Sequence, residues 1–179
     1  MKRTRIRVFI GAGKSQLVSS DGVEQISLRE AERLDDFFSQ VSEHCGLPVV
    51  FHEDGSEIGD GDLIVGHYDA IERLLASDRS RPRAGDCIAI GVPRRQALQL
   101  AESMHLGGVI DGMSFSQWRI AYPGGQVALY ARREFERSMR GSVTAAPVDN
   151  SEHYCRITAQ SGETLPAFLA NYLKLMLHH

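Results

Sequence analysis

The sequence predicts an α/β fold: a mainly parallel open sheet flanked by helices, with an antiparallel hairpin added in the second half and an apolar helix near the C-terminal end. Two observations support this class. Over residues 1–112, short apolar runs alternate with amphipathic segments, which is the rhythm of βαβ units and of a parallel sheet. Further on, a Pro-Gly-Gly turn separates two runs rich in β-forming residues, a pattern typical of a hairpin.

The first predicted strand, Ile6–Ile10, runs into the turn Gly11–Ser15. The Gly-Lys-Ser ending of this turn is that of a phosphate-binding P-loop, which also needs a glycine five positions before Gly13. Val8 stands at that position, and a Ser-Ser-Asp-Gly turn cluster follows where a P-loop would open a helix. We therefore predict a strand that ends in a glycine turn, and no P-loop.

The rest of the first half continues the alternation. Ser27-Leu28-Arg29-Glu30 is a capping box, and it begins a helix whose apolar residues recur every three or four positions until Gly46 ends it. Further strands are expected over 47–51, 87–90 and 109–110, and further helices over 69–76 and 94–104. Residues 63–65 are expected to form a short strand or the start of a helix.

The second half is less regular. Strands are expected over 118–122, 126–130 and 154–159, and a helix over 132–140. A last helix has Pro166 in its first turn, where a missing N–H costs little, and is apolar on most sides. We expect it to pack inside the fold; the alternative is a contact with a second copy of the chain or with a protein partner.

Composition narrows the classes of protein. A chain of 179 residues is one domain by default, here a βαβ core over 1–112 with an extension over 113–179. A formal net charge of −3 argues against nucleic acid as partner, and no apolar run reaches the roughly 18 residues of a membrane span. Three scattered cysteines fit the reducing cytoplasm better than a disulfide scaffold.

Candidate ligand-binding residues follow two strands. In open α/β sheets, ligands bind at the carboxyl ends of the strands, where small residues let a ligand approach the backbone. Gly11, Gly13 and Lys14 follow the first strand, and Arg94 and Arg95 begin the helix after the 87–90 strand. Two arginines at a helix N-terminus suit a phosphate or a carboxylate. These five residues are our predicted binding set.

Glu102 is the predicted catalytic residue, on the helix over 94–104. It lies beside the apolar face of that helix, where a carboxylate can reach a cleft and act as base, nucleophile or ribose hydrogen-bonder. The alternative is a helix glutamate that faces solvent. The acidic loop over 52–62 fails the EF-hand spacing, so we predict no metal site and interpret it as a solvated loop, with a ligand-binding or lid role left open.

The order of these parts resembles TIR-like and nucleoside deoxyribosyltransferase-like domains. "RVFIGAG" resembles their opening strand and ligand-lining turn, "GLPVVFHEDG" their second strand and mobile loop, and "GDCIAIGVPRRQALQLAESMHLGGVID" their strand, glutamate-bearing helix and next strand. The resemblance covers about residues 5–112 and implies N-glycosidic chemistry on a nucleotide such as NAD, or nucleotide binding without turnover, with Glu102 as the catalytic glutamate. The Ser or Trp-Cys signatures usual before that glutamate are absent, and the 119–130 hairpin is foreign to the family plan.

Two functional hypotheses follow. The first is a cytoplasmic protein that binds a nucleotide or another phosphorylated anion, with cleavage of an N-glycosidic bond as its enzymatic form. The second is a non-catalytic interaction or accessory protein that acts through self-association or a partner, with the last helix as its contact. The sequence specifies neither a substrate nor a cofactor.

Overall fold

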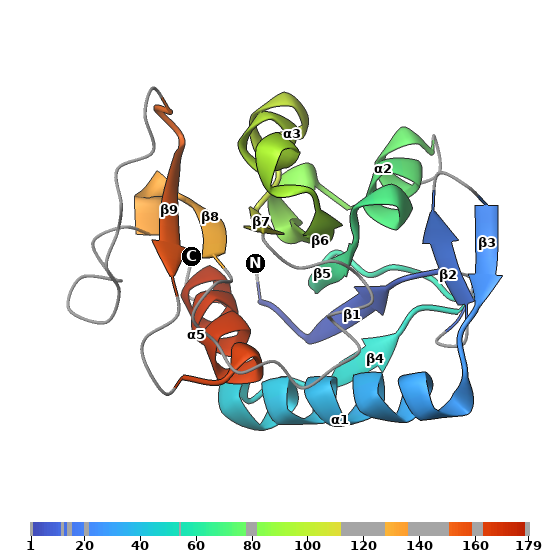
Figure 1. Ribbon diagram of the computed structural model, residues 1–179. Helices are drawn as coiled ribbons and strands as arrows, with labels where there is room; N and C mark the ends of the chain where they lie inside the picture. Colours follow the sequence, from blue (N-terminus) through green and yellow to red (C-terminus); the bar gives the residue numbers. More distant parts are fainter. Residues whose placement is uncertain are drawn as a thin grey trace.

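The fold is built on one seven-stranded sheet in the order β4-β1-β5-β6-β7-β8-β9 (Figure 1). The computed structural model describes residues 2–11, 13, 16–19, 22–53, 55–77, 82–111, 128–135, 151–158 and 163–177. Five of the strands are parallel: β1 Arg5–Phe9, β4 Val49–Phe51, β5 Asp62–His67, β6 Cys87–Val92 and β7 Gly108–Asp111. The prediction of an α/β protein with a mainly parallel sheet is confirmed.

The antiparallel part of the sheet lies beside β7. The strand β8, Ala128–Arg132, pairs antiparallel with β7 on one side and with β9, Tyr154–Thr158, on the other. The expected strand over 118–122 lies outside the described residues. The helix expected from residue 132 is not found in its first part, because Arg132 ends β8 and Arg133–Phe135 form a single 3-10 turn, η3. Its remainder, 136–140, is not described.

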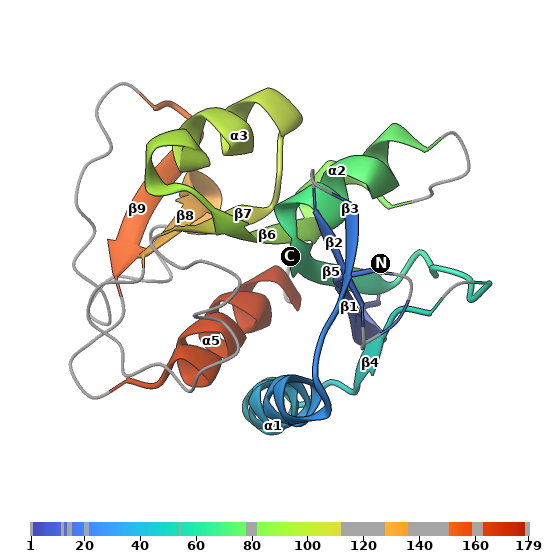
Figure 2. The same cartoon turned by 45° about the vertical axis from the view of Figure 1, so that its right-hand side comes forward.

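Helices cover both faces of the sheet. Figures 1 and 2 show α1, Leu28–Cys45, and α5, Leu165–Leu177, on one face, and α2, Tyr68–Ala76, and α3, Ala97–Met104, on the other. The apolar residues divide in the same way. Ile6, Val8 and Ile90 belong to the cluster under α1 and α5, while Ile64 and Val109 belong to the cluster under α2 and α3.

Packing explains why the last helix is apolar on most sides. Within α5 the residues Leu165, Phe168, Leu169, Tyr172, Leu173 and Met176 are all buried, and the helix lies against α1. The expectation that α5 packs inside the fold is therefore confirmed. Its apolar composition no longer calls for a second copy or a partner. In the part of the chain that the structure describes, no helix is long and apolar enough to cross a membrane.

A small hairpin separates β1 from α1. The strands β2, Gln16–Ser19, and β3, Gly22–Gln25, pair with each other in a two-stranded sheet apart from the main one. The sequence predicts only a turn at this place. Leu17 anchors the hairpin, since its side chain is 6% exposed and belongs to the core under α1.

The parallel strands have the spatial order second, first, third, fourth, fifth, which is one of the two common orders of doubly wound sheets. The chain must therefore cross from β4 over β1 to reach β5. The described residues of this crossover, 52, 53 and 55–61, form no helix. This is the acidic loop of the sequence, and it covers part of the face of β1 that points away from α1.

Candidate functional site

The candidate site lies at the carboxyl ends of β1 and β5, which are neighbours in the sheet. After β1 the chain continues through the β2–β3 hairpin to α1 on one face, whereas after β5 it enters α2 on the opposite face. The two connections diverge, so this is the point where the strand order reverses. In doubly wound sheets such a point is where small molecules bind.

Gly11 shapes the end of β1. It is buried, and a Cβ atom built on it would lie 2.4 Å from the carbonyl oxygen of Gln16. No side chain fits at that distance, so the chain can fold back toward β2 only with glycine here. Gly13 is half-buried and its carbonyl oxygen accepts a hydrogen bond from the N–H of Gln16 at 3.3 Å. These two predicted residues therefore lie together in one tight turn.

His67 ends β5 and caps α2. Its Nδ1 accepts a hydrogen bond from the N–H of Asp69 at 3.3 Å and lies 3.5 Å from the Asp69 carboxylate. The ring is 6% exposed and lies against Gly91, at the end of β6, which has a φ of +84° and no room for a Cβ atom. Burial lowers the pKa of His67 more than the Asp69 carboxylate raises it. The imidazole is thus held neutral at the N-terminus of α2.

The structure describes only some of the predicted cationic residues. Arg95 is exposed in the 3-10 turn η2, Arg94–Gln96, which follows the carboxyl end of β6. The backbone of Arg94 lies in the same turn, and Lys14 is not among the described residues. The strand β2 begins at Gln16, where a P-loop would have a helix. The structure therefore agrees with the prediction of a glycine turn without a P-loop.

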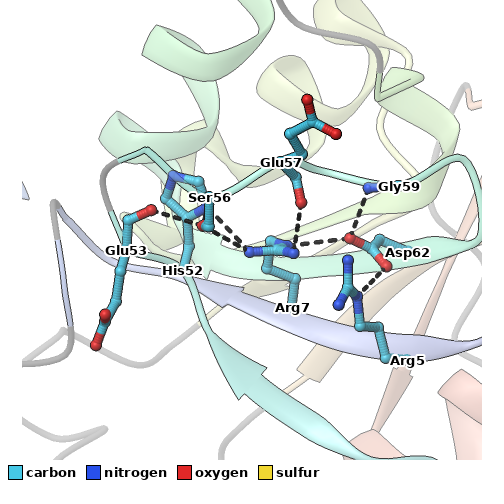
Figure 3. A network of polar contacts seen from close by, with 8 residues as sticks. All are labelled: Arg5, Arg7, His52, Glu53, Ser56, Glu57, Gly59 and Asp62. Carbon is cyan, nitrogen blue, oxygen red and sulfur yellow. Dashed lines mark hydrogen bonds and ion pairs between the residues drawn. The ribbon is translucent and has the colours of Figure 1, made fainter.

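Beneath this edge, Arg7 fastens the crossover loop to β1 (Figure 3). Its guanidinium donates to Asp62 Oδ2 at 3.0 Å, to Ser56 Oγ at 3.1 Å and to the carbonyl oxygen of Glu57 at 2.7 Å. The side chains of Arg7 and Asp62 are 4% and 0% exposed. Figure 3 shows the carboxylate of Glu57 pointing away from the network while its carbonyl oxygen faces Arg7.

Asp62 is the anionic centre of this network. It also accepts from Nε of Arg5 at 2.6 Å and from the N–H of Gly59 at 3.0 Å. Burial raises the pKa of Asp62, but the hydrogen bonds from Arg5, Gly59 and Arg7 outweigh it, so the net pKa lies below its usual value. Among the described residues no group of acidic, histidine or cysteine side chains could hold a metal ion. Ion pairs and hydrogen bonds of Arg7 and Asp62 thus hold the loop against β1.

Glu102 does not lie with the predicted binding residues. It is in the last turns of α3, and its Oε1 accepts from Ser151 Oγ at 2.8 Å, just before β9 begins. The start of β9 pairs with the end of β8, and the end of β8 pairs with the start of β7. Glu102 is therefore at the amino edge of the parallel strands, opposite to Gly11 and Gly13.

Sequence reasoning assigned no site role to His67 or Arg7, and it considered Asp62 only as one carboxylate of the acidic loop. A signal for Arg7 exists, because Arg5 and Arg7 alternate with apolar residues along β1 and so mark one polar face on a central strand. No comparable signal exists for His67, since its role depends on the end of β6. No known protein family, curated protein or solved structure matches this chain.

Proposed function

We propose that the protein binds a small molecule with an anionic group, a nucleotide or another phosphorylated compound, at the carboxyl ends of β1 and β5. The observation that supports this most is the reversal of strand order at these two strands, with the tight turn of Gly11 and Gly13 at its rim. Among the described residues, a Cβ atom on Gly13 would have the side chain of Glu53 nearest to it, at 4.0 Å, so a ligand can approach the backbone of the turn at Gly13.

The positive charge for the anion comes from arginine and lysine. The N-terminus of α2 is already capped by His67 and carries the buried Asp69, so it does not favour a second negative charge. The cations that follow the strand ends are Lys14 after β1 and Arg94 and Arg95 after β6. We assign the anionic group to these three residues.

We propose that the protein binds this ligand, and we do not propose that Glu102 catalyses its turnover. Cleavage of an N-glycosidic bond, which the sequence resemblance implies, needs a carboxylate beside the sugar. Glu102 lies at the other edge of the sheet. Hydrolysis of NAD by this protein, followed as release of nicotinamide and abolished in Glu102→Gln, would contradict this part of the proposal.

The test is calorimetric titration of the purified protein with nucleotides, NAD and sugar phosphates. We expect one of these classes to bind, and we expect Lys14→Ala with Arg94→Ala to weaken binding at least about tenfold, since hydrogen bonds to charged groups contribute about 1.5–3 kcal/mol. Arg29→Ala, an exposed residue of α1, is the matched control and should bind normally. Unchanged affinity in the double variant would refute the placement.

A further inference from the structure

The amino edge of the sheet holds a second candidate site, a pocket of about 360 Å³ between α3, the end of β8 and the start of β9. This volume is at the lower end of the range for small-molecule sites. Of the residues that the structure describes, the following line it: Glu102, His105, Arg132, Arg133, Glu134, Glu152, His153 and Tyr154. The pocket does not depend on the function proposed above, because it lies at the opposite edge.

The wall that carries Glu102 is fixed by hydrogen bonds. Ser151, which is 5% exposed, accepts from the N–H of Tyr154 at 3.1 Å and donates to Glu102 Oε1 at 2.8 Å. The hydroxyl of Tyr154 lies within hydrogen-bonding distance of the carbonyl oxygens of Ala101 and Leu106. Burial raises the pKa of Tyr154 to about 12, although the nearby charge of Arg132 lowers it; the carboxylate of Glu102 raises it further. The neutral hydroxyl of Tyr154 therefore links β9 to α3.

Glu102 accepts a hydrogen bond from the neutral hydroxyl of Ser151, and among the described residues it forms no ion pair with an arginine or a lysine. The C-terminal end of α3, capped by His105 in the left-handed conformation, adds the negative pole of the helix to the same wall. This side of the pocket therefore attracts a positively charged ligand group.

Two arginines, Arg132 and Arg133, also line the pocket. Arg132 Nε lies 3.0 Å from Glu134 Oε1, and both side chains are about two-fifths exposed, at 41% and 42%. An exposed ion pair of this kind contributes about 1 kcal/mol or less, so a ligand anion can replace Glu134 at small cost. The Nε of Arg133 donates to the carbonyl oxygen of Ser151 at 2.9 Å, which holds a second guanidinium in the lining of the pocket.

We propose that this pocket binds a small zwitterion, an amino acid or a similar amino-carboxylate, with its ammonium group at Glu102 and its carboxylate at Arg132 and Arg133. A small pocket lined by charges of both signs selects a ligand that carries both charges. A simple anion would face Glu102 and Glu152, and a simple cation would face the two arginines. Only the zwitterion pairs both ends.

The test is calorimetric titration with each of the proteinogenic L-amino acids in a phosphate-free buffer of low ionic strength. For the amino acid that binds, two analogues are compared, one without the ammonium group and one without the carboxylate. Each analogue should bind at least about tenfold more weakly, because each loses one charge-assisted contact. Absence of binding by every amino acid, or equal binding of either analogue, would overturn the proposal.

Variants locate the binding. Glu102→Gln and Arg132→Gln each keep a polar side chain of similar size, and both should lose affinity by at least about tenfold. Glu43→Gln, an exposed residue of α1 on the other face of the sheet, is the control and should bind like the wild type. Circular dichroism confirms that each variant is folded, and either pocket variant that folds is sufficient for the test. Full affinity in a folded pocket variant would overturn the assignment.

Titration with nucleotides distinguishes the two sites. Nucleotide binding that is lost in Lys14→Ala and kept in Glu102→Gln belongs to the carboxyl edge and leaves the zwitterion proposal to its own titration. Nucleotide binding that is lost in Glu102→Gln would assign the pocket to a phosphorylated ligand and refute the zwitterion. The failure of either proposal is thus recognisable by itself.

Discussion

Arg5 and Arg7 are two residues apart on β1, and both donate to Asp62, yet their surroundings differ. The side chain of Arg5 is 36% exposed, whereas that of Arg7 is 4% exposed and also bonds to the crossover loop. A buried charge that loses its partner cannot recover hydration, so removal of one partner is costly there and inexpensive at the surface.

We expect Arg7→Met to lower the free energy of unfolding by about 3 kcal/mol, because Asp62 and the loop carbonyl lose a buried donor. Arg5→Met should lower it by about 1 kcal/mol or less, since Asp62 keeps Arg7. Urea denaturation of the two variants and the wild type measures both effects. Equal losses in the two variants would show that burial does not distinguish them.

His67 makes stability depend on pH. Its pKa in the folded protein lies below the ordinary value of 6.5, so the unfolded chain binds a proton that the folded protein resists. The stability it contributes is complete above that value and is lost as the pH falls from it toward the lower folded pKa.

His67→Asn should reduce this pH dependence, since asparagine keeps an N-cap acceptor for Asp69 but does not titrate. The measurement is the free energy of unfolding at about pH 7.5 and about pH 5.5 for both proteins. The two proteins share every other titratable group. The difference between their losses of unfolding free energy from the higher to the lower pH is therefore due to His67. A decline as steep in the variant as in the wild type would contradict the assignment.

Among the elements, α1 shows what local sequence can predict. Glu30 N–H donates to Ser27 Oγ at 3.2 Å, and Ser27 N–H donates to Glu30 Oε2 at 3.0 Å, so the predicted capping box is confirmed. Gly46 ends the helix at a φ of 77°. Both signals act within four residues, and they can therefore be recognised in the sequence without the rest of the fold.

Ser27→Ala should lower the free energy of unfolding by about 1 kcal/mol, because the N–H of Glu30 loses its acceptor. Ser103→Ala is the matched control: that hydroxyl is exposed on α3 and bonds to the carbonyl oxygen of Leu100, and the change should stay within about 0.5 kcal/mol. Thermal and urea unfolding measure both variants. An unchanged free energy of unfolding in Ser27→Ala would mean that α1 is held by its packing alone.

Elements that depend on distant strands were not predictable in the same way. The sequence predicts a helix from Arg132, but Arg132 extends β8, whose two sides are paired with β7 and β9. Glu102 lies apart from Gly11 and Gly13 for the same reason: its neighbour Ser151 is 49 residues away in the sequence. Helical periodicity places Glu102 on α3 but carries no information on which edge of the sheet it meets.

At the scale of the whole molecule, the fold separates two edges with different chemistry. The carboxyl edge offers glycine turns and the reversal of strand order, whereas the amino edge offers a pocket with charges of both signs. The prediction of an α/β class follows from patterns along the chain. The division of the candidate residues between two edges follows from the antiparallel return of β8 and β9, which only the assembled sheet shows.

Tyr172 of α5 ties this antiparallel part to the parallel strands. Its hydroxyl donates to the carbonyl oxygen of Gly107, just before β7, and accepts from the N–H of Arg132 at the end of β8 at 3.2 Å. The side chain is 1% exposed, and burial raises the pKa of this hydroxyl above its usual range. A single neutral hydroxyl thus satisfies a backbone donor and a backbone acceptor from two strands.

Tyr172→Phe should lower the free energy of unfolding by about 1–3 kcal/mol, because both backbone groups lose a partner where water does not reach them. Asn171→Ala, the neighbouring exposed residue that bonds to Glu163, is the control and should change stability by less than about 0.5 kcal/mol. Urea unfolding measures both. If Tyr172→Phe were as stable as the control, α5 would be held by its apolar contacts alone. In that case the strand pairing of β8 would determine the position of Arg132 in the pocket.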